Sequence, residues 1–165
     1  MLLSIQANGL TYINHFNSQF AGEVGLISLG LGKEFSSYSI GGMYGFVPSE
    51  VSGGPLIETV TLRQTYEFFH WKRIALHAGL NVFHVLGIKY HTHDYGTAPD
   101  SYYPIGSIRG LLNLGITVAY NKKESKLFYI EAGMNDITIV NLFNNSRVIN
   151  PQDEVSLALG FKQRF

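Results

Sequence analysis

The chain has 165 residues, of which 15% are charged and 13% aromatic, and its formal net charge is zero. Zero net charge gives no electrostatic case for binding nucleic acid, and the lack of cysteine excludes disulfides, thiolate nucleophiles and thiolate metal sites. No apolar run approaches the ~20 residues of a membrane helix, so any membrane crossing has to be made by strands.

The length suits one domain, residues 1–165. Alternation of apolar with small or polar residues predicts an all-β fold of about eight strands. The expected strands lie near Leu3–Asn14, Val24–Phe35, Tyr38–Val47, Leu56–His70, 74–82, 108–120, 128–135 and Glu154–Phe165.

The connections alternate in length along the chain. Tight turns are expected near Ser36, Lys72 and Lys122, and long loops near Gln19, Ser52, Tyr95 and Asn145. Transmembrane barrels collect short turns at one end and long loops at the other, and an even strand number puts both termini on the same side. The alternation therefore favours a closed eight-stranded antiparallel up-and-down transmembrane β-barrel.

The composition of the polar face indicates which side of the strands points inward. That face holds mostly Gly, Ser, Thr, Ala and Asn, with few charges. A water-soluble, lipocalin-like barrel has the same alternation but needs Lys, Glu and Asp on the outside. Small residues with a few opposite charges suit the filled interior of a narrow barrel. We therefore expect the apolar face to point outward, and the soluble barrel is the alternative.

The last strand, Glu154–Phe165, ends on an aromatic residue that completes an apolar stripe of Val155, Leu157, Leu159 and Phe161. Here the chain resembles the closing strand of bacterial outer-membrane barrels, whose terminal aromatic is read by the barrel-insertion machinery. As a whole it resembles the small barrels of the OmpX type, the transmembrane domain of OmpA, and the lipid A deacylase PagL. The resemblance implies a location in the bacterial outer membrane. No signal peptide is visible, so we expect the sequence to be the mature segment of a longer precursor.

The comparison with the deacylase transfers no catalytic residue. That family carries a His-x-Ser-Asn stretch in a late strand, whereas the corresponding residues here, 133–142, contain neither His nor Ser. Another pair, Glu58 and His84, faces each other if the turn at Trp71 is tight. A carboxylate that orients an imidazole is half of a hydrolase site, but the pair lies beyond the ~9–11 residues that cross the membrane and is expected at the rim.

Two further groups are candidates for binding. His91 and His93 beside Asp94 could bind a divalent cation, but structural sites use more ligands, so no metal and no cofactor is expected. Polar residues on the inward face predict a network in the lumen that either lines a narrow ion path or plugs the barrel, and we favour the plug. Its members are Arg63, Glu67, His77, Arg109, Asn113 and Glu131.

These features lead us to expect a non-enzymatic barrel that serves envelope structure or lipid organisation. Its expected partners are outer-membrane lipids (lipopolysaccharide and phospholipid) and the insertion machinery during assembly. Small residues on the outward face also allow a homo-oligomer; they are Ala7, Gly9, Gly42, Ala78, Gly110 and Ala132. The alternatives are a lipid A or phospholipid hydrolase and a small ion channel.

Overall fold

A computed structural model describes residues 12–22, 24–53, 56–86, 108–144 and 155–165. Eight antiparallel strands form a closed barrel in which each strand pairs with its sequence neighbour and β1 pairs with β8. The strands are β1 (His15–Phe20), β2 (Ile27–Phe35), β3 (Tyr38–Val47), β4 (Ile57–Trp71), β5 (Ile74–Leu86), β6 (Ile108–Ala119), β7 (Lys126–Asn135) and β8 (Ser156–Arg164). The predicted up-and-down barrel is confirmed.

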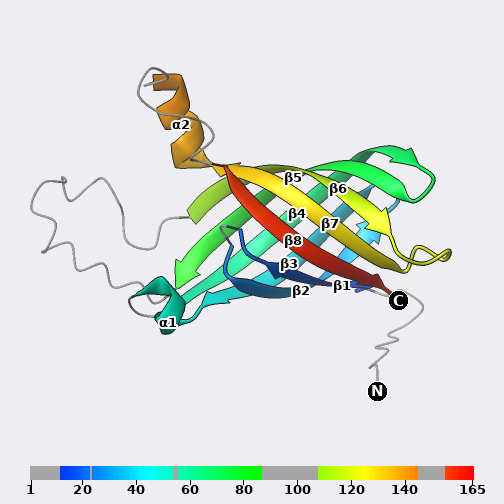
Figure 1. Ribbon diagram of the computed structural model, residues 1–165, viewed down its shortest axis with the longest axis horizontal. Helices are drawn as coiled ribbons and strands as arrows, with labels where there is room; N and C mark the ends of the chain where they lie inside the picture. The colour runs from blue at the N-terminus through cyan, green and yellow to red at the C-terminus, as the bar shows by residue number, and fades with distance from the viewer. Residues whose placement is uncertain (1–11, 23, 54–55, 87–107, 145–154) are drawn as a thin grey trace, which may run out of the picture.

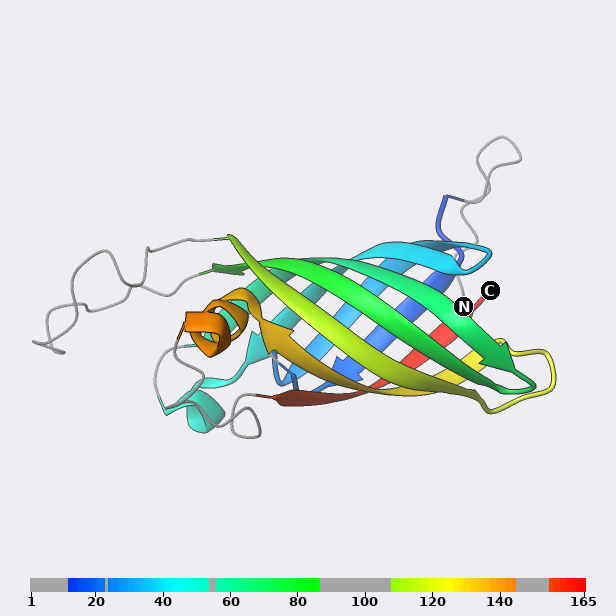
Figure 2. The same cartoon turned by 90° about the horizontal axis from the view of Figure 1, so that it is seen from above.

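The two ends of the barrel differ (Figures 1 and 2). One end, here the turn end, carries the β2–β3, β4–β5 and β6–β7 turns and the C-terminus. The opposite end, here the loop end, carries two short helices, α1 (Ser49–Ser52) and α2 (Asp136–Asn144). Among the described residues, neither helix is long and apolar enough to cross a membrane.

Two of the turns are two-residue hairpin connections. Phe35 pairs with Tyr38 and Trp71 with Ile74, which leaves Ser36-Ser37 and Lys72-Arg73 between them. The first residue of each turn has positive φ, 53° at Ser36 and 54° at Lys72. Left-handed backbone at this position matches the twist of the flanking strands. Both short turns lie where they were predicted, and the second consists of Lys72-Arg73 alone, because Trp71 still pairs with Ile74.

The first strand was placed wrongly. The sequence predicted a strand at Leu3–Asn14 and a loop over His15–Glu23, but His15–Phe20 form β1, and residues 1–11 lie outside the described part of the chain. The reason is that β1 has buried polar side chains at His15, Asn17 and Gln19, so its inward face resembles a polar loop. As a result, the connection near Gln19 is a short turn at Ala21–Leu26, closed by a 2.8 Å hydrogen bond from the Ala21 amide to the Leu26 carbonyl.

The barrel is apolar outside and polar inside. On β6, Leu112, Leu114 and Ile116 expose 54%, 63% and 49% of their surface, whereas the alternate residues Asn113 and Thr117 are buried. The remaining strands alternate in the same way, and most of the inward residues are Thr, Asn, Gly, Ala or charged. A smaller number of inward residues are apolar, among them Met43, Phe83, Leu111 and Leu127. The lipocalin-like alternative expects apolar side chains such as Leu112, Leu114 and Ile116 inside the barrel, whereas the structure has them on the outside.

Candidate functional site

The centre of the lumen holds a buried ion pair between Arg63 on β4 and Glu131 on β7. Arg63 donates from both terminal nitrogens: Nη1 lies 3.0 Å from Glu131 Oε2, and Nη2 contacts Oε1. The two side chains are only 6% and 3% exposed. Since a bidentate guanidinium–carboxylate pair neutralises both charges and uses their directional hydrogen bonds, the two strands are joined across the lumen.

Four more side chains complete this central cluster. His77 Nε2 lies 2.8 Å from Glu131 Oε1, and Thr117 Oγ1 lies 3.0 Å from His77 Nδ1. A neutral imidazole protonated at Nε2 satisfies both contacts, because Nε2 then donates to the carboxylate and Nδ1 accepts from the hydroxyl. Tyr129 lies beneath Arg63, with the guanidinium carbon 5.0 Å from the ring centroid. Its hydroxyl donates to Gln19 Oε1 over 3.3 Å.

The lumen has room for large inward side chains because several of them lie over a glycine on the neighbouring strand. His77 pairs directly with Gly115, and Tyr129 pairs with Gly160. A Cβ atom at Gly115 would stand 2.5 Å from His77 Nε2, and one at Gly160 would stand 2.0 Å from the Tyr129 ring. Asn113 covers Gly79 in the same way. The glycines therefore provide the space that the polar plug occupies.

A second cluster closes the turn end of the lumen. Arg164 on β8 donates to both carboxylate oxygens of Glu34, at 2.9 and 2.5 Å. Lys162 Nζ lies 3.9 Å from the same carboxylate, and Glu67 Oε1 lies 3.6 Å from Arg164. Glu34, Glu67 and Arg164 border an open hollow of about 460 Å³.

The loop end has an apolar closure instead. Val24, in the β1–β2 turn, is 1% exposed and packs with Phe83 on β5 and Leu111 on β6. Its carbonyl accepts hydrogen bonds from Ser28 Oγ at 3.3 Å and from Thr59 Oγ1. The turn is thereby fixed over the mouth of the barrel.

The six residues predicted for the lumen network do not form a single cluster. Arg63, His77 and Glu131 meet in the central cluster, and Glu67 belongs to the turn-end cluster. Arg109 lies at the loop end, with Nη1 3.8 Å from Asp136 Oδ2. Asn113 points inward, but its amide has no hydrogen-bond partner among the described residues. The partners Gln19, Tyr129 and Thr117 were missed. Tyr129 and Thr117 have inward parity on predicted strands, whereas Gln19 lay in a segment predicted as a loop.

The predicted pair of Glu58 and His84 does not face directly across its strands. Glu58 pairs with Leu86, and His84 pairs with Val60. The prediction assumed a turn centred on Trp71, but Trp71 pairs with Ile74, which moves the partner of Glu58 toward higher residue numbers. The register shift between Glu67 and Phe69 moves it back by one residue, so Glu58 pairs with Leu86 rather than with His84. The Glu58 carboxylate instead accepts a hydrogen bond from the Tyr44 hydroxyl. This arrangement gives Glu58 a structural partner at the outer surface.

The metal candidate at His91, His93 and Asp94 lies outside the described residues. Within residues 12–22, 24–53, 56–86, 108–144 and 155–165, no group of three or more His, Asp or Glu could hold a metal ion.

Comparison with known proteins adds no relative: no family model, no curated protein and no solved structure matches the chain. The geometry alone therefore defines the class, a closed eight-stranded antiparallel barrel with an apolar exterior and a polar lumen. The outer surface and the polar plug are its two candidate functional features.

Proposed function

We propose that the protein is an integral outer-membrane barrel with a filled lumen, acting without catalysis in envelope structure or lipid organisation. The observation that carries the proposal is the continuous apolar exterior. Soluble monomers rarely expose apolar patches larger than a few hundred Å², whereas Leu114, Ile130 and Leu157 on three neighbouring strands are 63%, 58% and 65% exposed. The hydrocarbon core of a lipid bilayer would remove this apolar surface from water.

Aromatic residues near the turn end support the same proposal. Outer-membrane barrels carry aromatic girdles at the two interfaces, where an amphipathic ring meets both acyl chains and headgroups. Exposed aromatic side chains gather here on β2, β4, the turn after β6 and the C-terminus: Phe35, Tyr66, Phe68, Phe69, Trp71, Tyr120 and Phe165. These aromatic residues lie where we expect one membrane interface.

The filled lumen argues against the channel alternative. The Arg63–Glu131 pair and its neighbours occupy the centre, and Val24, Phe83 and Leu111 close the loop end. A narrow eight-stranded barrel has just enough interior for its own side chains. The closed lumen leaves the outer surface and the loop end as the parts that meet other molecules.

A pair of arginine substitutions tests membrane insertion. In a lipid bilayer, Leu114→Arg near the middle of β6 should destabilise the barrel by about 2–4 kcal/mol, and Ile108→Arg at the start of the strand by only about 0–1 kcal/mol. In a water-soluble barrel, both substitutions of these exposed residues should cost less than about 0.5 kcal/mol. Urea unfolding in phosphatidylcholine vesicles, followed by the mobility shift between folded and heated samples, measures both. Equal, small effects, or folding in buffer without lipid, would overturn the proposal.

A further inference from the structure

The exterior of the barrel is hollowed on one side. A groove of about 760 Å³ runs over β6, β7 and β8 and reaches Phe68 and Leu76. The groove is open to the surroundings and almost wholly apolar, with walls that include Leu114, Ile116 and Ile130. Ala132 lies between Leu114 and Leu157 on the adjacent strands, and its short side chain leaves the hollow open. A linear hydrocarbon chain is the natural occupant of such a surface.

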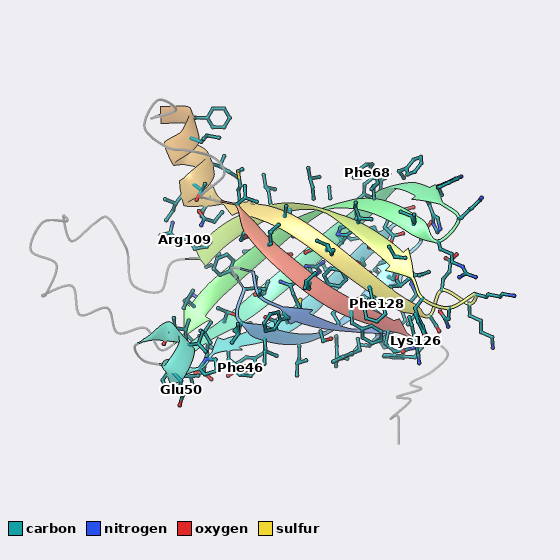
Figure 3. All side chains as sticks on the ribbon, viewed as in Figure 1. Phe46, Glu50, Phe68, Arg109, Lys126 and Phe128 are labelled. Atoms are coloured by element: carbon teal, nitrogen blue, oxygen red, sulfur yellow. The ribbon has the colours of Figure 1, made fainter. Side chains whose placement is uncertain are left out.

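The groove ends beside two basic turns. The Ala119 amide donates to the Arg73 carbonyl over 2.8 Å, so the Lys72-Arg73 turn lies directly next to the end of β6. Lys122 and Lys123 are exposed in the following turn, and Lys126 is exposed where β7 begins. Figure 3 shows Lys126 and Phe128, a groove residue, at this same end of the barrel.

The charge at these turns is strongly positive. The cations Lys72, Arg73, Lys122, Lys123 and Lys126 outnumber the one carboxylate, Glu124, by four (five minus one). The Glu124 carboxylate lies 3.9 Å from His70 Nε2, and the Glu124 carbonyl accepts a hydrogen bond from Arg164 over 3.1 Å. Glu124 therefore pairs with none of the five cations, and none of them lies within ion-pair distance of a carboxylate among the described residues.

We propose that this surface binds an anionic phospholipid, with an acyl chain in the groove and the phosphate against the basic turns. The inference rests on the proposed membrane location and adds a lipid class to it. Ammonium and guanidinium groups donate strong, charge-assisted hydrogen bonds to phosphate. A basic side chain at a membrane surface contributes about 1 kcal/mol toward anionic lipid. A zwitterionic lipid fills the groove equally well but gains less from the cations, so the turns set the selectivity.

The test uses the full chain folded into vesicles of phosphatidylcholine and phosphatidylglycerol in equal amounts. Lipids that remain on the barrel after transfer to mild detergent are identified by native mass spectrometry. The wild type should retain phosphatidylglycerol preferentially. The triple variant Arg73→Gln, Lys122→Gln and Lys123→Gln should lower that preference on the order of 10-fold, because several such charges act together and salt screens part of their effect.

Two matched variants separate this surface from general effects. Lys33→Gln removes a cation that lies over the Phe35 ring on β2, away from the groove, and should leave the preference unchanged. Ala132→Leu should fill the groove and reduce retention of both lipids. Gly42→Leu adds at least as much bulk on the outer face of β3, where a Cβ atom meets nothing within 4 Å, and should leave lipid retention unchanged.

The possible outcomes distinguish the two proposals. A wild type that inserts but retains both lipids equally overturns the inference on lipid class and leaves the membrane proposal standing. Equal preference in the wild type and the triple variant also overturns it. A chain that fails to insert into any vesicle, although it folds in buffer, overturns both. Each variant is first checked for folding by its mobility before and after heating.

Discussion

Replacing Glu131 with Leu tests whether the central ion pair lies in a lumen that excludes water. The substitution leaves the Arg63 guanidinium buried without its carboxylate, and His77 without the acceptor for its Nε2–H. Removal of one partner from a buried pair typically costs about 3–5 kcal/mol, because the other charge remains desolvated. Glu131 is 3% exposed, so the full penalty is expected here.

The double variant Arg63→Met and Glu131→Leu supplies the decisive comparison. Apolar replacements of similar volume often restore or exceed the stability of a buried ion pair, so the double variant should be within about 1 kcal/mol of the wild type. Urea unfolding in vesicles measures both, with the fluorescence of Trp71, the one tryptophan of the chain, as the signal. Glu50→Gln on the exposed helix α1 is the control, expected to cost less than about 0.5 kcal/mol. A loss of about 1 kcal/mol or less for Glu131→Leu would refute the reasoning, since it would mean that water reaches Arg63.

Three further predictions concern the packing of the barrel. Gly160→Val should destabilise it by about 1–3 kcal/mol in the same unfolding assay, because the added carbons overlap the Tyr129 ring. Gly45→Ala should displace the turn that closes the loop end, since its Cβ would stand 1.9 Å from the Val24 carbonyl oxygen; hydrogen exchange of the Leu26 amide, which donates to the Phe46 carbonyl, should accelerate. The wild type should show no discrete conductance steps in planar bilayers, because side chains fill the lumen.

Each of these expectations has a result that contradicts it. A Gly160→Val variant as stable as the wild type would show that Tyr129 has room to move. Unchanged exchange at Leu26 in the Gly45→Ala variant would mean that the closure does not depend on this contact. Regular conductance steps from the purified wild type would contradict the claim that side chains fill the lumen, and would favour the alternative of a small ion channel.

The sequence predicted the outer face of the barrel well, because the physical constraint on it is simple. Each strand needs one side that water does not have to solvate, and alternation with period two reveals that side directly. Tyr38–Val47 was predicted at both boundaries, and the β8 stripe of Leu157, Leu159 and Phe161 points outward as expected. The loop at residues 87–107 and the Asn-rich segment at 145–154 lie outside the described residues.

The inner face was harder to predict, because contacts across the lumen, and not a local sequence pattern, determine which residues stand there. Gln19 accepts hydrogen bonds from Arg63 and Tyr129, which are distant in sequence. Nothing near Gln19 distinguishes it from a loop residue, and for this reason the whole of β1 was assigned as a loop. One local signal was available: a glycine directly opposite a large polar residue, as in the pair of His15 and Gly32.

The seam between β1 and β8 has a kinetic consequence. With six residues, β1 is the shortest strand in the described part of the chain, whereas the longest strands, β4 and β5, have fifteen and thirteen residues. The pairings of β1 with β8 and with β2 each join only six residue pairs, so thermal fluctuations should open the barrel beside β1 before the longer pairings. A barrel that opens most readily beside β1 should also close there last. The pairing of the first and last strands is therefore the natural final step of assembly.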